Sequence, residues 1–167
     1  MRSTWKHASV ITIWVAIAVY AGFIFQLSSA PIQAQPPPIQ ATYQATNETV
    51  RNTVILPTGQ PPRYTPDYLH LFLYIGFGML LYFGFIVLGA KARHFAINLA
   101  WLSGTFYALT DEYHQSFVPG RTSDWKDAVA DATGVLVGIF LAILFINLAL
   151  KVRKRLGSPW DAYLGEV

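Results

Sequence analysis

Four long apolar segments, separated by polar stretches, dominate the pattern of this chain. They run over residues 8–27, 69–88, 95–112 and 128–150. A helix needs about 20 apolar residues to cross a bilayer, and inside lipid it satisfies its own backbone hydrogen bonds. The pattern therefore predicts an all-α membrane protein, a bundle of four transmembrane helices in a single domain over residues 1–167. The third segment is the shortest of the four.

Basic residues are unevenly divided between the segment ends. Eight of them lie before the first segment, between the second and third, or after the fourth: Arg2, Lys6, Lys91, Arg93, Lys151, Arg153, Lys154 and Arg155. The positive-inside rule puts these ends in the cytoplasm. We therefore expect both termini in the cytoplasm, a cytoplasmic tail over 151–167, and a long exterior loop over 28–66.

The exterior loop holds eight of the ten prolines of the chain. Proline-rich stretches favour extended, polyproline-like backbone over helix. Two interpretations stay open: a spacer between spans, or a cap over the exterior face that also docks a partner. The first segment has an alternative interpretation as a cleaved signal peptide. Its roughly 20 apolar residues exceed the 7–15 of a signal's apolar region, so we expect it to be retained.

Composition supports the membrane interpretation and excludes other classes. The chain is 53% hydrophobic and only 13% charged, whereas soluble domains carry about 25% charged residues. The net charge of +3 is spread over segment ends, which gives nucleic-acid binding no support. With no cysteine, disulfides and thiolate chemistry are excluded. We expect the lipid bilayer as a partner and no cofactor.

Ionisable residues gather where the predicted topology places the exterior ends of the segments. Helical spacing aligns His70 with Tyr74, Asp127 with Asp131, and Asp111 with either His114 or Gln115. Charged groups inside a bilayer are costly and usually face a bundle interior or a water-filled cavity. The spacing therefore predicts an outward-facing polar pocket. Its expected members are His70, Tyr74, Asp111, Glu112, His114, Gln115, Arg121, Asp127 and Asp131.

Two glycines follow the carboxylates of the fourth segment on the same helix face. Gly134 and Gly138 are four residues apart. Small residues at this spacing let another helix approach closely. We expect these glycines to form a helix-packing seam.

Three uses of the pocket stay open. In the structural alternative, Arg121 bridges the carboxylates in an ion-pair network. In the binding alternative, the pocket holds the headgroup of a lipid-linked sugar or phosphate, which Arg121 would contact by paired hydrogen bonds. In the catalytic alternative, His114 or His70 is the general base of a membrane-embedded enzyme. We interpret the site as binding or structural before catalytic.

A metal site and a role as an accessory subunit are further alternatives. His70, His114, Glu112 and Asp127 are metal-ligand types. However, no His-x-x-x-His or Glu-x-x-His pair fixes a geometry, so no metal is expected. The long exterior loop and the basic tail would suit an accessory subunit of a larger membrane complex.

The run from Tyr107 to Arg121 resembles the signature of the VanZ-like family. The resemblance continues through Ser123, Asp127, Asp131, Gly134 and Gly138, and includes Phe25, Ser28, Ser29, His70, Tyr74 and Gly76 or Gly78. It implies a multi-pass protein of the bacterial inner membrane with a role in the cell envelope. The family takes its name from a factor linked to antibiotic resistance, against the glycopeptide teicoplanin. Its mechanism is not established, so the resemblance implies no particular reaction.

Overall fold

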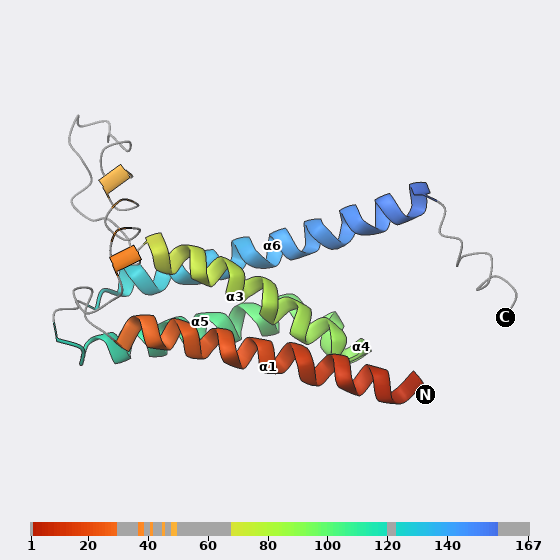
Figure 1. The fold of residues 1–167 in the computed structure, drawn as a ribbon, viewed down its shortest axis with the longest axis horizontal. Coiled ribbons are helices and arrows are strands. Elements are labelled where there is room, and N and C mark those ends of the chain that lie inside the picture. The colour runs from red at the N-terminus through yellow and green to blue at the C-terminus, as the bar shows by residue number, and fades with distance from the viewer. Residues whose placement is uncertain are drawn as a thin grey trace, which may run out of the picture.

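The structure, a computed structural model, is all-α and holds no strand in the residues that it describes (Figure 1). These are residues 2–29, 37–38, 41, 45, 48–49, 68–119 and 123–156. The helices are α1 (Arg2–Ser29), α3 (Tyr68–Val87), α4 (Ala90–His94), α5 (Ala96–Gln115) and α6 (Trp125–Leu156). Most of the expected exterior loop, and the tail beyond Leu156, lie outside the described residues.

Four long helices run lengthwise beside one another, and α3 is the central one. It packs against α1, α5 and α6, and α5 packs against α6 and α1. The start of α1, the end of α6 and the short helix α4, which links α3 to α5, lie toward the same end of the bundle (Figure 1). The turn into α4 needs Gly89, whose φ of 125° few side chains tolerate.

Three of these helices are long and apolar enough to cross a membrane. The candidate spans are His7–Ser29, Leu69–Val87 and Trp125–Arg155. The helix α5 is not among them because it carries many polar residues: Asn98, Ser103, Thr105, Thr110, Asp111 and Glu112. Three of the expected segments are therefore helices that could span a membrane by length and composition, while α5 lies beside them as a fourth long helix.

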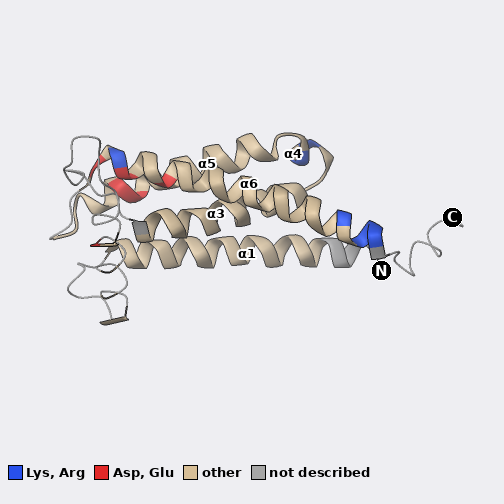
Figure 2. Ribbon diagram, turned by 90° about the horizontal axis from the view of Figure 1, so that it is seen from above, with Lys and Arg blue, Asp and Glu red and all other residues tan. Residues whose placement is uncertain are grey.

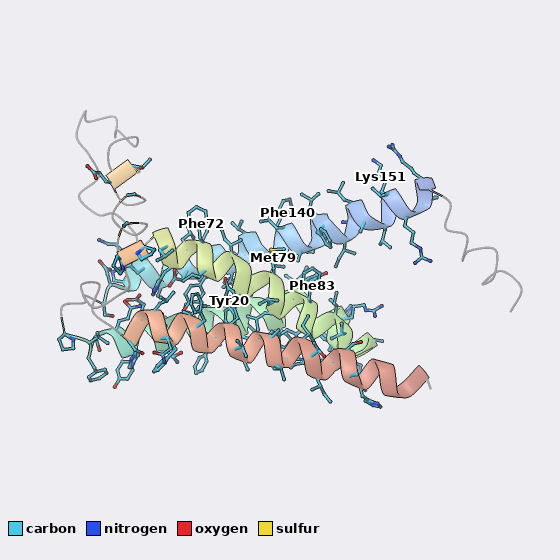
Figure 3. The ribbon with its side chains drawn as sticks, in the orientation of Figure 1. Tyr20, Phe72, Met79, Phe83, Phe140 and Lys151 are labelled. Atoms are coloured by element: carbon cyan, nitrogen blue, oxygen red, sulfur yellow. The ribbon has the colours of Figure 1, made fainter. Side chains whose placement is uncertain are left out.

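Large apolar side chains on the outside of the bundle are compatible with contact to lipid. Phe72 of α3 is 62% exposed and Phe140 of α6 is 64% exposed. Both point away from the neighbouring helices (Figure 3). In water such a surface would be unfavourable, whereas lipid tails are as apolar as these side chains.

The helices extend beyond the apolar segments that predicted them. The first begins at Arg2 rather than near residue 8, and the last covers Trp125–Leu156 rather than 128–150. Hydropathy measures only the apolar part of a helix, whereas lysine and arginine are good helix formers in water. Asp124 also caps α6, since its Oδ1 accepts a hydrogen bond from the Lys126 N–H at 3.0 Å.

Glycines bring the backbones of α3 and α6 very close together. A Cβ atom on Gly78 would collide with the carbonyl of Val135, and one on Gly138 with the carbonyl of Ile75. Gly134 faces Leu71 and Tyr74 in the same way. The close approach fixes the rotation of α6 relative to α3 and so decides which of its residues meet the centre of the bundle.

Two tyrosines tie α1 to its neighbours by hydrogen bonds across helices. The Tyr20 hydroxyl donates to the Leu73 carbonyl at 3.1 Å, and the Tyr107 hydroxyl donates to the Ala21 carbonyl at 2.6 Å. In both cases the hydroxyl bonds to a carbonyl oxygen within a helix, which has a second lone pair beyond the one used in the helix. Such bonds link α1 to α3 and to α5 near the end of the bundle where the polar residues lie.

Candidate functional site

Six polar side chains from four helices are buried together at one end of the bundle, and we call them the polar cluster. They are Ser28, His70, Asp111, Glu112, Gln115 and Asp131, each at most 5% exposed. Figure 2 shows the acidic residues at the end opposite the basic residues of α4 and of the end of α6. The cluster forms because the ends of α1 and α5 meet the beginnings of α3 and α6 there.

Asp111 holds the central position in the polar cluster. Its Oδ2 accepts hydrogen bonds from the Ser28 hydroxyl at 2.8 Å and from the Gln115 amide at 3.3 Å. Its other oxygen, Oδ1, is buried and has no hydrogen-bond partner among the described residues. Two helices therefore position this carboxylate while leaving one acceptor unused.

The His70 imidazole lies between two carboxylates. Its Nδ1 is 3.7 Å from Asp111 Oδ2 and 3.9 Å from Asp131 Oδ2. The Gln115 amide nitrogen is 3.5 Å from the same ring atom, at the limit of a hydrogen bond. These separations suit an ion pair or a shared ligand better than direct hydrogen bonds.

Glu112 approaches the cluster from the side of α6. Its Oε2 accepts a hydrogen bond from the backbone N–H of Asp124 at 3.1 Å. One atom of each of His70, Glu112 and Asp131 that could bind a metal ion lies within 4.8 Å of the corresponding atoms of the other two. Three helices thus bring one nitrogen and two carboxylate oxygens to a common point.

Tyr74 lies one helical turn from His70 on α3. It is fully buried, and its ring centre is 6.4 Å from that of His70. Its hydroxyl has no hydrogen-bond partner among the described residues. The cluster therefore borders a second buried polar atom that is not used.

His114 lies apart from the polar cluster although it is only two residues from Glu112. Its Nε2 is 3.1 Å from the Ser29 hydroxyl, and its ring centre is 4.5 Å from that of Phe25. Residues two apart on a helix point to different faces, so Glu112 faces α6 and His114 faces α1. Asp127 is half-buried one turn before Asp131.

The structure thus brings together His70, Tyr74, Asp111, Glu112, Gln115 and Asp131 from the expected set. Arg121 lies outside the described residues, and with it the expected bridge to the carboxylates. The sequence analysis did not predict that Ser28 belongs to the site. The only feature that could have indicated it was the resemblance of the Phe25–Ser29 segment to the family pattern, and that resemblance assigns no role to the serine.

The polar cluster carries more negative than positive groups. It holds three carboxylates and one imidazole, and no lysine or arginine among the described residues pairs with Asp111 or Glu112. Buried charges are costly unless they are paired. Among the described residues, the hydrogen-bonding atoms of the cluster are therefore mostly carboxylate oxygens.

Replacement of Ser28 by alanine is expected to lower the free energy of unfolding by about 1–3 kcal/mol, because a buried carboxylate loses a donor. Ser103 is exposed on α5, so Ser103→Ala is the matched control and should change little. Thermal unfolding of both variants in the same detergent measures the difference. Equal stability of the two variants would contradict the buried Ser28–Asp111 hydrogen bond.

Comparisons with known proteins agree with the family resemblance of the sequence. No match was found among curated proteins, and none was found among solved structures. The family profile described as VanZ/LLP1 matches residues 11–146. That range includes all six residues of the polar cluster and most of the four long helices. The chain therefore belongs to the VanZ/LLP1 family.

Proposed function

We propose that this protein binds a sugar- or amine-bearing headgroup of an envelope amphiphile at the outer face of the bacterial inner membrane. The observation that carries the proposal is the buried, acceptor-rich cluster supplied by four helices at one end of the bundle. Ionisable residues at membrane depth are functional by default because they are costly to keep there. The unused Asp111 Oδ1 gives a donor-bearing headgroup an acceptor.

The proposal includes four membrane crossings with both termini in the cytoplasm. The acidic residues of α5, Asp111 and Glu112, are buried, whereas most of its exposed large residues are apolar: Ile97, Trp101, Leu102, Phe106 and Leu109. An outer face of this kind suits lipid. The basic residues of α4 and of the last turn of α6 support a cytoplasmic position for that end of the bundle.

A reporter that is active only outside the cytoplasm tests the crossings. Fused after Val118, between α5 and α6, it should be active because α5 has carried the chain outward. Fused after Val167, it should be inactive because α6 returns the chain to the cytoplasm. Inactivity after Val118 together with activity after Val167 would show that α5 does not cross, and the exterior site would then have no basis.

Headgroup binding is tested with two lipids that share acyl chains, a neutral diglycosyl diacylglycerol and phosphatidic acid. The purified protein in nanodiscs should bind the glycolipid in preference, because sugar hydroxyls donate to Asp111 and a phosphate is repelled. Asp111→Asn should weaken glycolipid binding by about 10-fold or more, since a hydrogen bond to a charged group is lost. Native mass spectrometry measures the preference between the two lipids and the loss of glycolipid binding in the variant.

The control for this substitution is Asp124→Asn. Asp124 caps α6 through its side chain, and asparagine caps a helix equally well. This variant should bind the glycolipid as the wild type does. A preference for phosphatidic acid, or equal loss in both variants, would contradict the proposal.

Two alternative functions predict different results. An accessory subunit of a larger complex would co-purify with a fixed partner in mild detergent, and its bound lipid would be incidental. A membrane-embedded enzyme would lose activity in a folded His114→Ala variant. The contacts of His114 with Ser29 and Phe25 favour a packing role for this histidine, so we rank the enzyme last.

A further inference from the structure

We propose that His70, Glu112 and Asp131 bind a divalent transition-metal cation at the centre of the polar cluster. The inference deepens the proposed function and rests on it for the biological use of the site, because the cation would lie where the headgroup is expected. It revises the expectation of no metal. That expectation rested on the absence of two metal ligands at a suitable spacing on one helix. These three ligands come instead from three helices, α3, α5 and α6.

The separations between the donor atoms fit one ion. Nitrogen and oxygen ligands about 2.1 Å from a metal lie roughly 3–4 Å from each other. His70 Nδ1 is 3.9 Å from Asp131 Oδ2, and all three ligand atoms lie within 4.8 Å of one another. A separation of up to 4.8 Å exceeds this range by less than 1 Å.

Two buried polar atoms beside the triad point to a ligand independently of it. Asp111 Oδ1 and the Tyr74 hydroxyl have no hydrogen-bond partner among the described residues, although Asp111 is 3% exposed and Tyr74 is 0% exposed. Each costs free energy if it stays unsatisfied. A cation with a bound water would satisfy both, since Asp111 accepts from the water and the tyrosine oxygen can donate or accept.

The chemistry of the triad suits a divalent cation. Two carboxylates and one neutral imidazole are groups that bind such ions, and a metal-bound histidine must be neutral.

The surroundings of the triad resemble the outer shell of a metal site. Ser28 and Gln115 hold Asp111 by hydrogen bonds, and the Asp124 N–H holds Glu112. Partners of this kind orient ligands and contribute to metal affinity. A mixed nitrogen and oxygen set suits Zn²⁺ and Mn²⁺ more than Ca²⁺ or Mg²⁺, which prefer oxygen alone.

Calorimetric titration of the chelator-treated protein in detergent with Zn²⁺, and then with Mn²⁺, tests the site. One equivalent of either metal should bind saturably to the wild type. His70→Gln should weaken binding by about 100-fold or more, and Glu112→Gln by about 10-fold or more. The control is His94→Gln, a histidine of α4 at the other end of the bundle, and it should bind as the wild type does.

Absence of binding to the wild type overturns the inference even if the variants fail to fold. Equal loss in His70→Gln and His94→Gln also overturns it, because the metal would then lie elsewhere. If the chelator-treated protein binds the glycolipid but binds no metal, the metal site is refuted and the proposed function stands. If it binds metal but no glycolipid, the proposed function is refuted and the metal site stands.

Discussion

Gly138→Ala is expected to destabilise the protein by about 2–3 kcal/mol, because the new methyl group overpacks the contact between α3 and α6. A Cβ at this position would collide with the backbone carbonyl of Ile75 and would lie 3.0 Å from the backbone nitrogen of Met79. Neither atom belongs to a side chain that can turn away. The two helices must therefore separate to admit a single carbon atom.

The control is the same substitution at Gly22 in α1, where nothing lies within 4 Å of an added Cβ. Alanine is the better helix former by about 0.5–1 kcal/mol, so Gly22→Ala should keep or raise stability. Thermal unfolding in detergent should show a fall of roughly 5–10 °C for Gly138→Ala. Equal melting temperatures for the two variants would mean that α3 and α6 are not in such close contact.

The same contact has a consequence for the polar cluster. Asp131 lies seven residues before Gly138 on α6, and His70 lies five residues before Ile75 on α3. The glycine contact sets how closely these helices approach, and so it sets the 3.9 Å between His70 and Asp131. We therefore expect Gly138→Ala to weaken ligand binding as well as stability, although the residue is far from any ligand atom.

Hydropathy was sufficient to predict three of the long helices, but it was weaker for α5. Polar residues on both its buried and its exposed sides lower the average hydropathy of α5, although it also carries large exposed apolar side chains. Phe106 is 69% exposed, whereas Asp111 on the same helix is 3% exposed. The ends of α1 and α6 were also not predictable from apolar length, because polar and charged residues continue both helices beyond their apolar segments.

Helical spacing was enough to group His70 with Tyr74, since residues four apart share a face, but it left His114 and Gln115 as alternatives beside Asp111. It was not enough to say which faces meet. That choice depends on the rotation of each helix, which close contacts such as Gly138 with Ile75 decide. For the same reason no periodicity in α1 predicted that Ser28 would donate a hydrogen bond to Asp111.

Tyr74→Ala is expected to lower the free energy of unfolding by about 3–5 kcal/mol, because it empties a closely packed aromatic site. Tyr74 is 0% exposed, and its ring lies 6.1 Å from that of Phe77 and 6.3 Å from that of Tyr107. In lipid the helices associate through such packing rather than through removal of apolar surface from water. The control is Phe72→Ala on the same helix, where the side chain is 62% exposed and little packing is lost.

The substitution Tyr74→Phe distinguishes the contribution of the hydroxyl from that of the ring, because it removes only the hydroxyl. Since the hydroxyl has no hydrogen-bond partner among the described residues, its removal should keep stability or raise it by about 1 kcal/mol. If the hydroxyl belongs to the binding site, this more stable variant should bind Zn²⁺ or the glycolipid less tightly than the wild type, because a group kept at a cost to stability is kept for a ligand. A clear loss of stability in Tyr74→Phe would instead assign the hydroxyl to the fold.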